Sequence, residues 1–240
     1  MKKILFLADL HGNMPATLAF EKEIEKIKPD DVWFLGDAVG KGPESDKTLD
    51  WVRSHCDHFI SGNWDLGCVK SYKYGDTEEG IFNDFYVKQL GKERLEWLDS
   101  IPREDEVLIS GFNFRLLHGR PIDKNYHPYL TMDELKTGFT DSKGKVHNGF
   151  ISADCHMPYV IEMDEGYAIN TGSIGNSLGI PRCHALLIEG ELNSEEAAPI
   201  SMNILSIPYD NQAAADAADR SSMPNREAYK KEVLTGVYSR

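Results

Sequence analysis

Three short strand-like runs early in the chain are each followed directly by polar side chains that can bind cations. The runs cover residues 4–8, 32–35 and 58–60, and the clusters after them are Asp9-Leu10-His11, Gly36-Asp37 and Ser61-Gly62-Asn63. Stretches with helical spacing of apolar residues separate the runs, at residues 15–28 and 44–54. Alternating strands and helices form right-handed units with parallel strands, so we expect the three clusters at one edge of a sheet, where ligands bind in open α/β folds.

The second half of the chain has a different pattern, in which strand-like runs follow one another with few helices between them. These runs cover residues 107–110, 112–118, 150–153, 159–163, 167–170 and 183–188. Their spacing predicts an antiparallel second half that packs on the first as a second sheet. Before them, a helix is expected over residues 80–98, with a break near Gly91 and an end before Pro102.

Two regions stand apart from this pattern. Residues 120–148 form a polar insertion directly after His118, with one short helix expected at 132–136, and the insertion is either a lid beside the site or a surface excursion. The tail at 210–240 is rich in Ala and charged residues, with Pro224 between two expected helices. It packs either on the sheet or on another subunit as part of a homo-oligomer. The absence of repeats and linkers predicts one domain over residues 1–240.

Charge and composition restrict the possible partners. A formal net charge of −13 argues against nucleic-acid or anionic-membrane binding by bulk electrostatics. It leaves an anionic substrate open, because cations held in a site reverse the local field. No apolar run approaches the roughly 20 residues of a membrane span. The four cysteines show no CxxC spacing, which favours reduced thiols and a cytoplasmic location.

The polar clusters suggest a chemistry when they are taken together with His118 and Asp154-Cys155-His156, which follow later apolar runs. Carboxylates and neutral imidazoles are the ligands that hard first-row cations prefer. Two such cations, about 3.5–4 Å apart, supply the nucleophile and the charge stabilisation that phosphate-ester hydrolysis needs. Each cluster alone has a simpler explanation, because Gly-Asp is more often a turn and a single histidine is more often structural. The set of clusters, each placed after a strand, is what indicates a metal site.

The order of these residues resembles the calcineurin-like metallophosphoesterase superfamily, from about residue 3 to residue 190. The resemblance is carried by Asp9-x-His11, Gly36-Asp37, Gly62-Asn63, His118-Gly119 and His156-x-Pro158. Two further segments, Asp9-Leu10-His11-Gly12-Asn13 and Thr171-Gly172-Ser173-Ile174-Gly175, are similar to the small bacterial phosphodiesterase branch. Gly62-Asn63-Trp64-Asp65 and Ile207-Pro208-Tyr209-Asp210 are similar to bacterial hydrolases of asymmetric dinucleoside tetraphosphates.

The resemblance implies a four-layer α-β-β-α sandwich of two mixed sheets flanked by helices. It implies a dinuclear phosphoesterase in which a metal-bridging hydroxide attacks phosphorus, with catalytic roles at Asp37, Asn63, Asp65 and His118. One metal would be held by Asp9, His11, Asp37 and His156, and the other by Asp37, Asn63, His118 and Asp154. We expect two divalent or trivalent ions, Mn²⁺ first, with Fe, Zn and Mg as alternatives. Arg120 and Arg182 are candidates for binding the phosphates of a small, nucleotide-type substrate, with solvated surface charge as the alternative.

Two residues depart from the family pattern. Asp154 stands where the family usually has His, which favours Mn²⁺ or Mg²⁺ at that metal or else weakens the second site. Trp64 stands where many members have a His that protonates the leaving group. Because an indole cannot supply that proton, good leaving groups are favoured, as in phosphodiesters or dinucleoside polyphosphates. A phosphomonoesterase or protein phosphatase with the same site, or a degenerate non-catalytic binding module, remain the alternatives.

Overall fold

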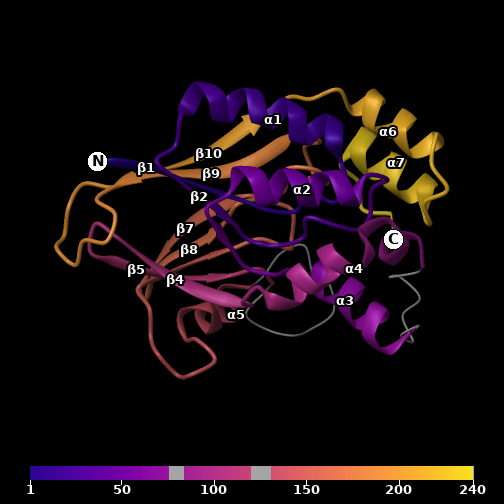
Figure 1. The fold of residues 1–240 in the computed structure, drawn as a ribbon. Helices are drawn as coiled ribbons and strands as arrows, with labels where there is room; N and C mark the ends of the chain where they lie inside the picture. Colours follow the sequence, from indigo (N-terminus) through magenta and orange to yellow (C-terminus); the bar gives the residue numbers. More distant parts are fainter. Residues whose placement is uncertain (76–83, 120–130, 240) are drawn as a thin grey trace.

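The computed structural model describes residues 1–75, 84–119 and 131–239 (Figure 1). Within them, two five-stranded sheets pack face to face. Their contact is an apolar layer in which Ile4, Phe6 and Trp33 from the first sheet meet Phe114 and Ile151 from the second. The stacked pair of mixed sheets expected from the resemblance is therefore confirmed.

The first sheet contains the strands that carry the early polar clusters. Its order is β10-β9-β1-β2-β3, with β1, β2 and β3 parallel and β9 antiparallel to both of its neighbours. The strands are β1 (Lys2–Leu7), β2 (Asp31–Phe34), β3 (His58–Phe59), β9 (Cys183–Gly190) and β10 (Ser201–Ile207). The parallel register of β1 and β2 pairs Leu7 with Phe34, so both strands end at the same edge. This arrangement is what the strand-helix-strand pattern predicted.

The second sheet corrects the expectation of an antiparallel second half. Its order is β4-β5-β6-β8-β7, and β6 is parallel to both β5 and β8. The strands are β4 (Glu104–Ile109), β5 (Phe112–Leu117), β6 (Gly149–Ser152), β7 (Tyr159–Met163) and β8 (Gly166–Asn170). The insertion after β5 is long enough to bring the chain back for a parallel pairing, which a tight turn cannot do. The run at 183–188 was also misplaced, because it forms β9 of the first sheet.

Helices cover the two outer faces. Strand β1 turns Leu5 and Leu7 outward, where they pack under α1 (Met14–Ile27) and α2 (Ser45–His55), while its alternate residues face the second sheet. Helices α3 (Asn63–Tyr74) and α4 (Asp84–Ser100) join the same outer core, and α4 is kinked at Gly91 as expected. On the other face, α5 (Met132–Lys136) and a short 3-10 helix (Thr137–Phe139) pack on the second sheet. The result is the four-layer sandwich.

The C-terminal tail packs on its own chain. Helices α6 (Asn211–Asp219) and α7 (Arg226–Thr235) lie side by side, and α6 runs next to α1 (Figure 1). Ala214, Ala218 and Tyr229 form a small core between the two helices. A homo-oligomer through this tail stays a prediction. Within the described ranges, none of the helices combines the length and apolar character needed to cross a lipid bilayer.

Candidate metal centre

The chain turns sharply where the polar clusters leave their strands. Asp9, His11, Asp37, Asp154 and His156 all have positive φ angles, between 48° and 61°. Such angles are uncommon for residues other than glycine and cost backbone energy, and they cluster at functional sites. Here the turns are fixed by backbone hydrogen bonds, from Asp9 N to Gly36 O at 2.9 Å and from His11 N to Asp37 O at 3.1 Å. They direct side chains from both strand ends toward one point.

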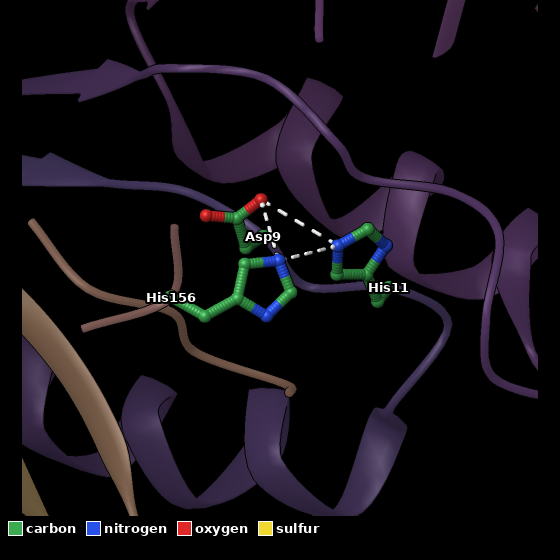
Figure 2. A group of neighbouring side chains, drawn as sticks. All are labelled: Asp9, His11 and His156. Carbon is green, nitrogen blue, oxygen red and sulfur yellow. Dashed lines mark hydrogen bonds and ion pairs between the residues drawn. The ribbon is translucent and has the colours of Figure 1, made fainter. Parts of the chain in front are cut away.

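The first group of converging side chains consists of Asp9, His11 and His156 (Figure 2). The two Nε2 atoms lie 3.2 Å apart, and each is 3.5 Å from Oδ1 of Asp9. All three side chains are buried. Residues separated by 145 positions in the sequence thus present one oxygen and two nitrogens to a common centre.

The second group consists of Asp9, Asp37 and His118, with Asn63 beside it. Nε2 of His118 lies 3.3 Å from Oδ2 of Asp37, 3.9 Å from Oδ1 of Asp9 and 3.1 Å from Oδ1 of Asn63. The same Asp37 oxygen is 3.6 Å from Nε2 of His11. Asp9 therefore belongs to both groups, and Asp37 lies between a histidine of each group.

The three histidines are held so that their Nε2 lone pairs face the two groups. In each ring, Nδ1 lies 2.5–3.0 Å from a backbone carbonyl oxygen. The pairs are His11 with Val39, His118 with Leu35, and His156 with Asn176. A carbonyl only accepts hydrogen bonds, so Nδ1 carries the hydrogen and Nε2 of the neutral ring keeps its lone pair. This is the arrangement that orients histidine ligands in metal sites.

Without a cation, the close approach of these atoms is unfavourable. The facing lone pairs of His11 and His156 repel, and Oδ1 of Asp9 is buried without a hydrogen-bond partner. Burial raises the pKa of Asp9 well above its usual range, and the carboxylates of Asp37 and Asp154 raise it further. A cation at each group would remove all three costs. Carboxylate, amide and imidazole ligands suit Mn²⁺, Fe, Zn²⁺ or Mg²⁺.

Asp154, which departs from the family pattern, is half-buried beside these groups. Its backbone N donates to Oδ2 of Asp9 at 3.2 Å. Its carboxylate is close enough to raise the pKa values of Asp9 and His118, yet it belongs to neither group among the described residues. The structure thus places Asp154 at the rim of the centre.

Asp65 and Trp64 lie at the start of α3, directly behind Asp37. Oδ2 of Asp65 accepts hydrogen bonds from the backbone N atoms of Asp37, at 2.8 Å, and Gly62, at 2.9 Å. Burial and the nearby Asp37 charge raise the pKa of Asp65 to about 7. The backbone N of Trp64 donates to Oδ1 of Asp37 at 2.8 Å, and its indole packs against the edge of His11. Both residues fix the position of Asp37.

The structure describes one of the two arginines suggested by the sequence. Arg120 lies outside the described residues. Arg182 donates from Nη2 to the backbone carbonyl of Ser206 on β10, at 2.9 Å, which engages its guanidinium with the first sheet.

The structure instead brings Lys41 to the centre, a residue that the sequence analysis overlooked. Lys41 is 8% exposed, and its ammonium lies 3.3 Å from Oδ1 of Asn176 and 5.9 Å from the centroid of the Trp64 ring. It lowers the pKa of Asp9, so the two charges interact. The available signal was a lysine between Gly40 and Gly42, in the turn after the Gly36-Asp37 cluster.

Comparison with known proteins gives a family and several relatives. Residues 2–168 match the family described as calcineurin-like phosphoesterase. The chain is 24% identical over 234 residues to an uncharacterized protein from Methanocaldococcus jannaschii, a similarity that covers 92% of this chain and 93% of that protein. It is 30% identical over 110 residues to a symmetrical bis(5'-nucleosyl)-tetraphosphatase from Buchnera aphidicola, but covers only 40% of that enzyme and 43% of itself. This relative is a symmetrical enzyme, whereas the sequence motifs suggested the asymmetric ones.

Solved structures with the same fold span the whole chain. A metallophosphoesterase from Sphaerobacter thermophilus has a TM-score of 0.73 at 20% identity, covering 98% of this chain and 99% of that one. A hypothetical protein from Pyrococcus horikoshii has a TM-score of 0.78 at 18% identity, with 100% of both chains covered. At these identities the likeness concerns the fold, which agrees with the two stacked sheets.

Proposed function

This chain belongs to the calcineurin-like phosphoesterase family, and from that premise we propose that it hydrolyses phosphodiester or nucleotide phosphoanhydride bonds at a pair of metal ions. One observation carries the proposal. Three histidine Nε2 atoms and the oxygens of Asp9 and Asp37 converge in two buried groups that share a carboxylate. A scaffold protein has no physical need for buried carboxylates and imidazoles converging at one point, because burying polar groups costs free energy.

The residues divide between two ions. Asp9, His11 and His156 would hold one, and Asp37, Asn63 and His118 would hold the other. Asp9 also belongs to the second group, and Oδ2 of Asp37 lies within 3.6 Å of a histidine Nε2 in each group. We propose Mn²⁺ as the preferred ion. When bound, such ions supply an activated water and neutralise charge on the phosphoryl oxygens. The chain's own contribution is to orient the ligands through the histidine-carbonyl bonds and through Asp65, which holds the backbone of Asp37 and Gly62.

Trp64 and Lys41 support a substrate with charged phosphates and good leaving groups. Trp64 is packed against His11, so this position provides no acid for a poor leaving group. Lys41 provides a buried ammonium whose charge interacts with Asp9, and an ammonium is suited to a phosphate oxygen. The similarity to a symmetrical tetraphosphatase supports dinucleoside polyphosphates within this class. A cytoplasmic location is proposed with this substrate.

The test is hydrolysis of a chromogenic phosphodiester by the Mn²⁺-loaded full-length protein, compared with Asp37→Asn. We expect a loss of at least about 100-fold, because the variant removes a carboxylate ligand of the metal ions whose positive charge would stabilise the transition state. Asp164→Asn, at an exposed carboxylate in the β7–β8 turn, is the matched control and should keep wild-type activity. Equal rates for Asp37→Asn and the wild type would overturn this site.

Metal content and substrate preference complete the test. The wild type should bind about two equivalents of metal, and fewer than about 1.5 would contradict a filled pair. Aryl diesters and dinucleoside polyphosphates should be hydrolysed faster than alkyl monoesters. A strong preference for phosphoserine peptides would instead indicate a protein phosphatase.

A further inference from the structure

A buried glutamate from the C-terminal helix α7 lies behind the candidate metal centre. Glu232 is 0% exposed, although carboxylates are rarely buried without specific partners. Its Oε2 accepts a hydrogen bond from Nδ2 of Asn176 at 3.2 Å, and its Oε1 accepts one from the backbone N of Ser239 at 3.1 Å. The second contact is local, whereas the first joins α7 to a loop 56 residues earlier in the sequence.

Asn176 connects this glutamate to two residues of the site. Its side-chain Oδ1 accepts from the ammonium of Lys41 at 3.3 Å, and its backbone carbonyl accepts from Nδ1 of His156 at 2.5 Å. That ring nitrogen of His156 points away from Asp9 and His11 (Figure 2). The Asn176 backbone N is fixed in turn by Oγ of Ser173, at 2.8 Å.

The orientation of the Asn176 amide follows from its neighbours. An ammonium only donates hydrogen bonds and a carboxylate only accepts them, so the amide oxygen must face Lys41 and the amide nitrogen must face Glu232. A negative charge on one side of the amide and a positive charge on the other polarise it in the same direction, which strengthens both bonds. Glu232 thereby also supplies part of the negative charge that keeps a buried ammonium favourable.

We propose that α7 is part of the machinery of this site, with Glu232 acting through Asn176 as a positioning residue for the Lys41 ammonium that receives a substrate phosphate. The inference rests on the proposed function and extends it to an element that lies beyond the family match at residues 2–168. The competing explanation is that Glu232 only anchors the chain end at Ser239. Only the first explanation predicts that loss of the Glu232 charge changes how Lys41 binds phosphate.

The experiment measures binding of inorganic phosphate to the Mn²⁺-loaded full-length protein by calorimetry, together with KM and kcat for the chromogenic diester. Glu232→Gln keeps the side-chain shape and removes the charge. We expect its phosphate Kd and its KM to rise about 3- to 10-fold, because a charge-assisted hydrogen bond is weakened. Metal content should not change, since the carbonyl that holds His156 belongs to the backbone. Glu227→Gln, also on α7 but 75% exposed, is the matched control and should behave as wild type.

A double-mutant cycle with Lys41→Met separates the two explanations. In the Lys41→Met background, Glu232→Gln should have no further effect on phosphate Kd, because the pair acts through one ammonium. An equal further loss in that background would show that Glu232 acts independently of Lys41 and would overturn the inference. Asn176→Leu removes both side-chain bonds and should reproduce the Glu232→Gln phenotype. It takes the place of Glu232→Gln if that variant does not fold.

The results also distinguish this inference from the function on which it rests. A wild-type protein that neither binds phosphate nor hydrolyses any substrate would overturn both. If the wild type does both and Glu232→Gln matches Glu227→Gln, only the role of α7 is lost.

Discussion

Asp9 and Asp154 differ in their relation to the two groups, although both carry carboxylates near the centre. Oδ1 of Asp9 belongs to both groups, while the Asp154 side chain lies at the rim. We therefore expect Asp9→Asn to lose most of both metals, because a neutral amide binds hard cations far more weakly than a carboxylate. Asp154→Asn should keep at least one equivalent. Metal analysis of the two proteins, grown with ample Mn²⁺, measures the difference.

The two aspartate substitutions control for each other, since each removes one charge at a residue with positive φ. Loss of both metals from Asp154→Asn, with normal metal content in Asp9→Asn, would reverse the assignment. It would mean that the Asp154 carboxylate moves into the centre when the ions bind.

Several site residues were predictable because their clusters follow apolar strands, and parallel strands end at one edge. The positions of Asp9, Asp37 and Asn63 after strands therefore predict that they lie together. Lys41 and Asn176 are not predictable in this way, because each lies in a glycine-containing turn with no periodic pattern around it. Their positions depend on contacts across the fold, 135 residues apart in sequence. Local sequence carries no information on such a pairing.

Two elements, α3 and β10, are not predicted by the sequence pattern. Helix α3 begins at Asn63, inside the polar cluster, and its buried face consists of Trp64, Cys68 and Val69 with Gly67 between them. This is a weak amphipathic pattern with a poor helix former in its middle. Strand β10 lies at the edge of the first sheet and is only half-buried, so its alternation of apolar and polar residues is indistinct. Tertiary packing decides both elements.

The junction between β3 and α3 has no room for a side chain at Gly62. A Cβ atom there would lie 2.0 Å from Oδ1 of Asp37 and 2.5 Å from its backbone N. Gly62→Ala should therefore displace Asp37, lower metal content and destabilise the fold by on the order of 1–3 kcal/mol. Gly119→Ala, beside His118 but with open space around its Cβ, should change neither. Metal analysis and urea unfolding test both variants, and normal metal binding by Gly62→Ala would contradict the steric argument.

The loop at 171–179 joins the site to the edge of the first sheet. Ser173 accepts a hydrogen bond from the His184 backbone N through its carbonyl and donates to Asp9 O through Oγ. The His184 ring lies between the hydroxyls of Ser177, at 3.0 Å, and Ser206, at 3.2 Å. Strand β9 thereby supports the turn at Asp9 through Ser173. The stability of this part of the first sheet therefore affects the candidate metal centre.

His184 should make the fold sensitive to acid. Burial, together with a smaller effect of the Arg182 charge, lowers the pKa of His184 to about 4. Between pH 6.5 and 4, His184 binds a proton in the unfolded chain but stays neutral in the folded chain. The free energy of unfolding therefore decreases as pH falls through this window. His184→Gln should reduce the loss by on the order of 1–2 kcal/mol. Urea unfolding of chelator-treated protein between pH 6.5 and 4 measures this loss of stability. Removing metal beforehand keeps metal release from contributing to the result. His55→Gln, on the exposed face of α2, is the control. If wild type and His184→Gln lose stability in parallel as pH falls, the His184 imidazole does not cause the acid sensitivity.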